Sequence, residues 1–315
     1  MDLIDVAIAS SPPSDPSTTQ LPISDHELDY AKELLMRTHD PDLVLNLERK
    51  CRDSRQRRID EGKDPLGFVG YIDDDTYVTT ETYDVCLRAT ACWIRAVDHV
   101  LSGSNSNACQ AAMALTRPPG HHATKGSSNG FCIFNFAAAA ALHAIEKDPE
   151  LKVSMFDWDV HYGQGVADIV KHHPRVRYAS IHQSPAFPYL GTKAGTDGDH
   201  NNILTLPILA DTTWTCGYRQ KFEDEIIPFL KSNDSWDPSL VIICSGYDAL
   251  DSDELAGVSL QARDYGEMTR QIRQHLSVPL MLGLEGGYQL KDAAGGGNLA
   301  DAVVETAGAL LEGEG

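Results

Sequence analysis

Four short polar motifs contain the residues whose types and spacing could do chemistry. They are Arg-Pro-Pro-Gly-His-His at 117–122, Asp-Trp-Asp-Val-His at 157–161, Gly-Tyr-Asp at 246–248 and Gly-Gly-Tyr at 286–288. Together they supply carboxylates and an imidazole suited to a divalent metal, two adjacent histidines suited to proton transfer, and a tyrosine among glycines. In this order, the combination indicates a metal-dependent amide hydrolase.

Asp159 and His161 are candidate metal ligands. They are two residues apart, and such residues point to the same side of an extended segment. Asp248 follows another predicted strand and is the candidate third ligand. Oxygen and nitrogen ligands without a thiolate suit Zn²⁺ or Fe²⁺, and three ligands leave a position open for water. The alternative is that these residues lie on the surface or cap a strand-to-helix turn.

His121 and His122 are adjacent, and two imidazoles in one pocket can divide general base and general acid duties near neutral pH. The Pro-Pro-Gly segment before them gives their loop a defined shape. Tyr288 follows two glycines and could donate a hydrogen bond to a developing oxyanion. Taken singly, the histidine pair could be an incidental loop feature, and the tyrosine could be a core residue near a turn.

Short β-rich runs alternate with helical runs, which predicts an α/β fold with a parallel sheet and helices on both faces. Because ligands bind beyond the carboxyl ends of such strands, and each motif follows a predicted strand, we expect the four motifs to converge. The predicted strands are 111–115, 153–157, 177–181, 240–245 and 279–284. The predicted helices are 25–47, 80–101, 135–147, 164–171, 213–231, 260–275 and 298–312, and 52–76 is predicted to form a long loop.

The 315 residues and 42% hydrophobic content suit one large domain, predicted at 25–315 after a loose N-terminal lead-in over 1–24. The net charge of −20 argues against direct nucleic-acid or membrane binding and favours basic peptides or polyamines, although it could serve solubility alone. There is no signal-peptide pattern and no apolar run of membrane-spanning length. Seven scattered cysteines without a CxxC pair indicate a reducing compartment, cytoplasmic and/or nuclear.

The four motifs, with Gly-Phe-Cys at 130–132 and Asp-Glu-Leu-Ala at 253–256, resemble those of the zinc-dependent histone deacetylase superfamily. The resemblance covers roughly residues 25–310 and is closer to the class II and bacterial-like members. It implies the arginase/deacetylase fold, a single domain around a mostly parallel sheet of about eight strands. It also implies hydrolysis of acetyl-lysine in proteins such as histones, and so a role in chromatin regulation.

The resemblance assigns roles to residues of each motif. It implies that Asp159, His161 and Asp248 bind Zn²⁺, with Fe²⁺ as a possible substitute. It implies that His121 and His122 handle protons and that Tyr288 polarises the scissile carbonyl. It implies that Asp157 accepts a hydrogen bond from His121 and contacts a structural K⁺, with Ser180 nearby. It also implies that the Gly130 carbonyl faces the substrate amide. Finally, it implies that Phe131 and Phe187 line an acyl-lysine tunnel with Leu255 at its rim.

The chain departs from the family pattern at several positions. Gln164 stands where the family usually has Asp or Asn supporting the second histidine, so His122 should be less basic. The usual first strand is not recognisable before residue 25. Glu254 beside Leu255 leaves open an acetylpolyamine amidohydrolase, in which the rim carries an acidic residue. An arginase-like manganese enzyme and a catalytically weak scaffold are the remaining alternatives.

Overall fold

An eight-stranded sheet forms the centre of the computed structural model, which describes residues 5–7, 22–102, 111–231, 236–290 and 298–312. The strand order is β1-β4-β10-β9-β5-β6-β8-β7, and within it the six strands from β4 to β8 run parallel. The edge strands β1 and β7 are antiparallel to their neighbours. The strands are β1 Asp5–Ala7, β4 Ala111–Leu115, β5 Val153–Asp157, β6 Val176–Gln183, β7 Gly195–Asp197, β8 Ile203–Ile208, β9 Leu240–Ser245 and β10 Leu280–Leu284.

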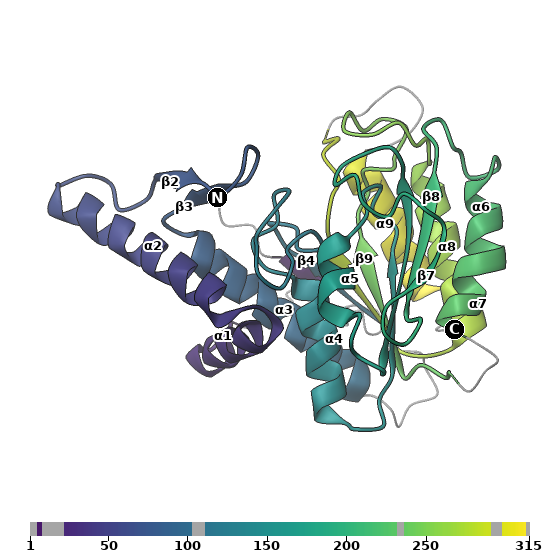
Figure 1. The fold of residues 1–315 in the computed structure, drawn as a ribbon, viewed down its shortest axis with the longest axis horizontal. Helices are drawn as coiled ribbons and strands as arrows, with labels where there is room; N and C mark the ends of the chain where they lie inside the picture. Colours follow the sequence, from purple (N-terminus) through teal and green to yellow (C-terminus); the bar gives the residue numbers. More distant parts are fainter. Residues whose placement is uncertain (1–4, 8–21, 103–110, 232–235, 291–297, 313–315) are drawn as a thin grey trace.

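The central strands are apolar on both faces because helices cover both faces. Along β5, Val153 and Met155 pack into one hydrophobic core, whereas Phe156 packs into the other. The first core lies under α3 Thr82–Ser102, α4 Phe136–Lys147 and α5 Gln164–Val170. The second lies under α6 Tyr218–Lys221, the π-helical turn η1 Phe222–Ile226, α7 Ile227–Leu230, α8 Ala262–Leu276 and α9 Leu299–Leu311, on the opposite side of the sheet in Figure 1. The predicted fold class is confirmed.

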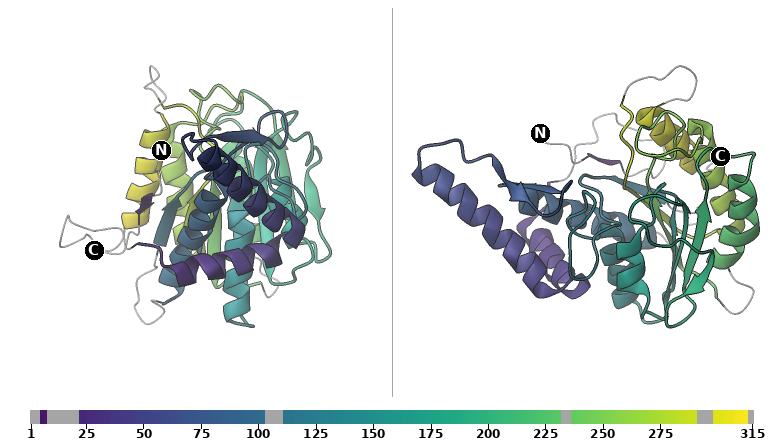
Figure 2. Two further views of the ribbon diagram at one scale, coloured as in Figure 1. Left: turned by 90° about the vertical axis from the view of Figure 1, so that its left-hand side faces the viewer. Right: turned by 45° about the horizontal axis from the view of Figure 1, so that its top comes forward.

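Helices α1 Asp25–Thr38 and α2 Pro41–Asp60, with the hairpin β2 Phe68–Tyr71 and β3 Tyr77–Thr79, form a lateral extension. Figure 2 shows α2 and the hairpin reaching away from the sheet. We refer to residues 22–79 as the N-terminal arm. Its helix α2 buries Val44, Leu47 and Cys51 on one narrow stripe, and residues 52–60 bury no side chain.

The prediction of a loop over 52–76 was therefore wrong. Residues 52–60 continue α2, and the hairpin occupies much of the remainder. Arginine is a good helix former, so this Arg-rich segment continues the helix without an apolar face. Arg55 also pairs with Glu81 and Asp84 at the start of α3, which fastens the exposed end of α2. The charge-rich pattern gave no periodicity from which to predict the helix.

The helix predicted over 213–231 is instead three short pieces that begin at Tyr218. Pro228 lies in the first turn of α7 and has no N–H to donate, which accounts for the wider π-helical turn before it. Strands β7 and β8 were not predicted. Neither was β1, which lies inside the segment expected to be a loose lead-in and pairs with β4. Residues 8–21 of that segment lie outside the described residues, so the domain boundary stays a prediction.

Candidate active site

The four motifs lie at the carboxyl ends of β4, β5, β9 and β10, which are neighbours in the sheet. Their loops are bonded to one another across long sequence separations. The Val160 N–H donates to Asp248 Oδ1 at 2.9 Å, and the Gly286 N–H donates to Asp159 Oδ2 at 2.8 Å. The expected convergence of the motifs at one edge is thus observed.

Asp159, His161 and Asp248 form a compact cluster. One ligand atom from each lies within 4.8 Å of the others. His161 Nδ1 is 2.9 Å from Asp248 Oδ2 and 3.2 Å from Asp159 Oδ1, and both carboxylates are fully buried. The sequence-predicted ligands are therefore brought together around one point.

The charges of this cluster suit a cation. Burial by itself lowers the pKa of His161, but the Asp248 and Asp159 carboxylates outweigh it and raise that pKa to about 11. Burial, with the charge of Asp159, raises the pKa of Asp248 to about 6. A Cβ at Gly246 or Gly286 would collide with the Asp159 side chain, so glycine is needed for this approach. Two buried carboxylates, one imidazole and a tight glycine cradle fit a borderline divalent metal.

His121 lies beside this cluster and is held by Asp157. Its Nδ1 is 3.1 Å from Asp157 Oδ2, which also accepts a hydrogen bond from the Tyr178 hydroxyl at 2.7 Å. Its Nε2 is 3.7 Å from Asp159 Oδ2. Burial lowers the pKa of His121, but the Asp159 and Asp157 carboxylates outweigh burial and raise it to about 10. His121 is accordingly the charged member of the histidine pair.

His122 is the neutral member, and Gln164 fixes its tautomer. The centroids of the His121 and His122 rings lie 4.0 Å apart. Burial and the charge of His121 hold the pKa of His122 well below its usual range. Gln164 Nε2 donates to the His122 carbonyl oxygen at 3.2 Å, which leaves Oε1 facing Nδ1 at 2.7 Å. Because an amide oxygen can only accept, Nδ1 carries the proton and Nε2 keeps a free lone pair. The low pKa comes from burial and His121, whereas the Gln164 hydrogen bond raises it, so the expected effect of Gln164 on the basicity of His122 stays a prediction.

Aromatic rings surround the histidine pair. Tyr288 lies edge-on to Phe131 at 5.8 Å, and Phe187 lies edge-on to His122 at 4.8 Å. Burial and the charges of Asp248 and Asp159 raise the pKa of Tyr288, so its phenol stays protonated. Gly130 has a φ of 54°, and a Cβ there would collide with Phe187 and His122. These four predicted residues therefore lie together around the histidines.

Ser180 and Leu255 lie farther out. Ser180 is the register partner of Asp157 on β6, and its hydroxyl bonds His182 at 3.0 Å. Leu255 is 49% exposed, and its N–H donates to Asp253, whose other oxygen accepts from the Tyr288 N–H at 2.8 Å. Leu255 is thus linked to the tyrosine segment without lying in the buried centre. The K⁺ site stays a prediction.

Glu285 and Arg117 were given no role in the sequence analysis. The Glu285 carboxylate accepts hydrogen bonds from the N–H groups of Gly120 and His121, at 2.6 and 3.0 Å. Arg117 donates to the Glu285 carbonyl at 2.8 Å and lies 5.3 Å from the centre of the Tyr288 ring. They join the histidine loop to the tyrosine loop. A glutamate directly after an apolar strand and before two glycines was the signal that could have revealed this role.

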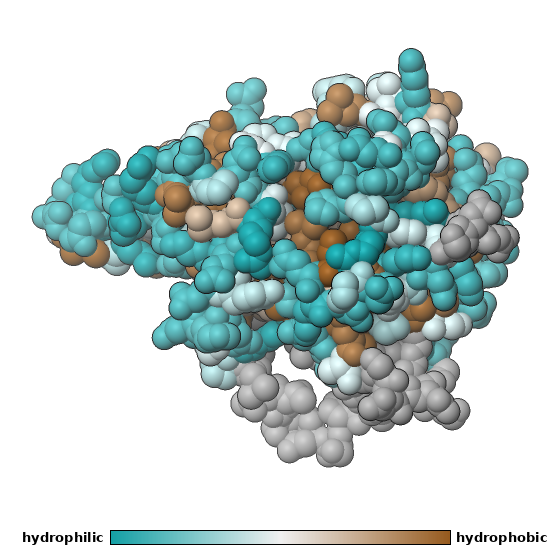
Figure 3. Space-filling model, turned by 60° about the horizontal axis from the view of Figure 1, so that its bottom comes forward, coloured by the Kyte–Doolittle hydropathy of each residue, from teal (hydrophilic) through white to brown (hydrophobic). Residues whose placement is uncertain are grey.

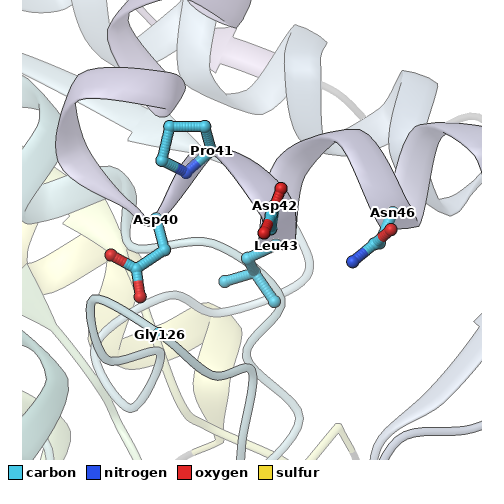
Figure 4. A pocket seen from close by; sticks show the side chains of 6 residues that line it. All are labelled: Asp40, Pro41, Asp42, Leu43, Asn46 and Gly126. Carbon is cyan, nitrogen blue, oxygen red and sulfur yellow. The ribbon is translucent and has the colours of Figure 1, made fainter.

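A cavity of about 570 Å³ elsewhere contains none of the predicted site residues. It lies at the start of α2 (Figure 4), where its lining includes Asp40, Asp42 and Gly126. The face seen in Figure 3 is mainly hydrophilic, with hydrophobic residues gathered near its centre. None of the described helices combines the length and the apolar composition that a bilayer-spanning segment needs.

A mostly parallel sheet with four buried carboxylates, three imidazoles and a protonated phenol at one edge is suited to hydrolysis. Residues 15–304 match the family model described as the histone deacetylase domain. The chain belongs to the histone deacetylase family.

Two relatives and a solved structure illustrate the match. An uncharacterised protein of Synechocystis is 41% identical over 77% of this chain and 74% of its own length. A probable deacetylase of Archaeoglobus fulgidus is 32% identical over 71% of this chain and 62% of its own length. The crystal structure of an acetylpolyamine aminohydrolase from Burkholderia pseudomallei superposes with a TM-score of 0.72 at 23% identity, covering 90% of this chain and 83% of that one. The last similarity concerns the fold alone.

Proposed function

We propose that this chain hydrolyses the acetyl amide of N-ε-acetyl-lysine in proteins such as histones, releasing acetate and the free lysine amine. The observation that carries the proposal is a neutral His122, with its Nε2 lone pair free, beside the buried cluster of Asp159, His161 and Asp248. A base of low pKa next to a metal-binding cluster suits the activation of water for attack on an amide.

Asp159, His161 and Asp248 would hold the metal, Zn²⁺ or Fe²⁺. When bound, the ion supplies Lewis acidity that polarises the acetyl carbonyl and lowers the pKa of water. The structural K⁺ would lie near Asp157 and Ser180, which are register partners on adjacent strands. Both assignments are part of the proposal and can be checked by metal analysis of the purified protein.

The remaining steps belong to side chains of the site. His122 accepts the proton of the attacking water at Nε2, since its Nδ1 proton is held by Gln164. His121, whose Nδ1 faces the Asp157 carboxylate, stabilises the developing negative charge as the imidazolium and supplies a proton to the leaving amine. Tyr288 keeps its proton and donates a hydrogen bond to the oxyanion. Glu285 and Arg117 keep the histidines and the tyrosine in register.

The substrate chain would pass between Phe131 and Phe187, with the Gly130 carbonyl accepting the amide N–H and Leu255 at the rim. An uncharged acetyl-lysine can enter such an apolar passage, whereas a free lysine ammonium would lose its hydration. The net charge of −20 would favour basic polypeptides around the target lysine. The cytoplasm and the nucleus, where such proteins occur, are the compartments that we propose.

Hydrolysis of acetylated polyamines is the second candidate function. Two observations favour it: the similarity in fold to an acetylpolyamine aminohydrolase, and the exposed Glu254 next to Leu255 at the rim. A carboxylate there could bind the cationic end of a polyamine. A catalytically weak scaffold is less consistent with the site, because Gln164 still holds His122 by two hydrogen bonds.

The test compares acetyl-lysine peptides with N-acetylspermidine, using protein stripped of metal and then supplied with Zn²⁺, Fe²⁺ or Mn²⁺. The proposal expects metal-dependent release of acetate, with a higher kcat/KM for basic acetyl-lysine peptides. A higher kcat/KM for acetylspermidine would instead support hydrolysis of acetylated polyamines. If no metal restores hydrolysis of either substrate, the enzymatic proposal is wrong.

A further inference from the structure

Three buried side chains form a second group of potential ligands beside the first cluster. One ligand atom each from His121, Cys132 and Glu285 lies within 4.8 Å of the others. Cys132 and Glu285 have no exposed surface, and His121 is 2% exposed. His121 and Cys132 lie in the connection between β4 and α4, and Glu285 directly follows β10. The group therefore depends on the fold and not on a local sequence pattern.

Only one of the two carboxylate oxygens of Glu285 accepts hydrogen bonds from the described residues. Its Oε2 accepts hydrogen bonds from the N–H groups of Gly120 and His121, whereas its Oε1 is buried and has no hydrogen-bond partner among the residues that the structure describes. An unpaired buried carboxylate oxygen costs free energy, so such a group is expected to gain a proton or a cation. The other two members offer a thiol and an imidazole nitrogen, which are ligands that Zn²⁺ prefers.

His121 is already oriented in the way that metal-binding histidines are. Its Nδ1 faces Asp157, so the nitrogen left for an ion is Nε2, which lies 3.7 Å from Asp159 Oδ2 of the first cluster. A carboxylate that holds the far nitrogen of a histidine is the common outer-shell arrangement at zinc sites. Cys132 is positioned by the His122 N–H, which donates to its sulfur at 3.4 Å. Two of the three ligands are thus fixed before any metal arrives.

We propose that His121, Cys132 and Glu285 form a second divalent-metal site, filled by Zn²⁺ in excess over the ion held by Asp159, His161 and Asp248. Cys132 and His121 lose their protons to solvent on binding, and Glu285 binds as the carboxylate. The thiolate and the carboxylate then balance the two charges of the ion, and His121 binds as the neutral ring.

Occupation of this site should inhibit the enzyme, a consequence that rests on the proposed function. Metal on Nε2 of His121 would block the ring nitrogen that delivers a proton to the leaving amine. The chain would then require one metal ion for turnover and be inhibited by a second.

Cobalt gives a direct test of the second site, because a cobalt–thiolate bond adds a charge-transfer band in the near ultraviolet. Cys109 and Cys216 are replaced by serine in every protein, since Cys216 is exposed. The metal-free parent should bind two equivalents of Co²⁺ and show the band, whereas Cys132→Ser should bind one equivalent and lack it. Cys244→Ser, which alters a buried thiol outside the group, should keep the band. No band in the parent, or a band that survives in Cys132→Ser, would overturn the proposal.

Activity in zinc buffers tests the inhibition. Each protein is normalised to its own highest rate, and Glu285→Gln provides a second variant in case Cys132→Ser folds poorly. Half-inhibition should require about 10-fold more free Zn²⁺ or more in both variants than in the parent, since even outer-shell changes cost about 10–100-fold in metal affinity. If the parent shows the cobalt band but its activity does not fall as free Zn²⁺ rises, the inhibitory role is overturned. Asp248→Asn should keep the band while losing turnover, so failure of the proposed function is distinguishable from failure of this site.

Discussion

The carboxyl edge of the sheet and the N-terminal arm differ in what holds their side chains. At the edge, Asp159, Asp248 and Glu285 are fully buried and bonded to loops more than 80 residues away in the sequence. In the arm, Phe68, Tyr71 and Tyr77 are each more than half exposed. The edge side chains are therefore fixed by buried bonds to distant loops, whereas these three arm rings lie largely in solvent. Substitutions should change chemistry in the first region and, at exposed positions of the arm, at most stability.

The largest effect is expected for Asp248→Asn. The change keeps the shape of the side chain but removes one of the two charges that attract a cation. Metal affinity should fall by at least about 100-fold, because loss of a ligand exceeds the cost of outer-shell changes, and turnover should fall with it. Metal content after dialysis and the rate of acetate release provide the measurements.

The matched control is Asp60→Asn, the same change at an exposed position in the arm. It should leave both the metal content and the rate of the protein unaltered. Equal losses in the two variants would abolish the contrast between the regions.

Tyr288→Phe should lower kcat by about 10²–10³, with KM little changed, if its hydroxyl acts as an oxyanion donor. The hydroxyl is the one group of Tyr288 that the change removes, and the ring contacts with Phe131 and Arg117 can persist. Tyr77→Phe makes the same change at an arm residue that is 62% exposed, and its kcat should stay within about twofold. Steady-state kinetics of both variants give the measurement. A Tyr288→Phe enzyme with the kcat of the parent would contradict the role proposed for the Tyr288 hydroxyl.

Sequence reasoning predicted the two regions unequally for physical reasons. Strands β4, β5 and β9 were predicted with the observed bounds, because strands buried on both faces appear as short apolar runs. The site residues follow those runs, and the carboxyl ends of neighbouring parallel strands necessarily meet. The part of α2 beyond residue 51 gave no such signal, since it depends on Arg propensity and ion pairs.

Parts of the site were also beyond sequence reasoning. The roles of Glu285 and Arg117 rest on hydrogen bonds between loops that are about 165 residues apart, which spacing alone cannot reveal. The orientation of the Gln164 amide, which fixes the tautomer of His122, required the coordinates of both residues.

Gln164→Glu should change the pH dependence more than the maximal rate. A carboxylate in place of the amide would favour protonated His122 and raise its pKa, by about one unit or more. His122 must be neutral to accept a proton, so activity would be lost as the pH falls through this higher pKa. The acidic limb of the kcat/KM profile should therefore move to higher pH. At a fixed pH on that limb, activity should fall about 10-fold for each unit by which the pKa of His122 rises. An unchanged acidic limb would mean that His122 is not the base.

Ser24→Ala should produce the smallest effect, confined to stability. Ser24 caps α1: its hydroxyl accepts from the Glu27 N–H, and Glu27 in return accepts from the Ser24 N–H at 2.9 Å. Loss of such a cap costs about 1 kcal/mol in the free energy of unfolding, measurable by urea denaturation. Because the capping box lies in the arm, kcat and KM for acetyl-lysine peptides should match those of the parent. A fall in kcat without further loss of stability would show that the arm acts on the chemistry at the sheet edge, and the contrast between the two regions would have to be abandoned.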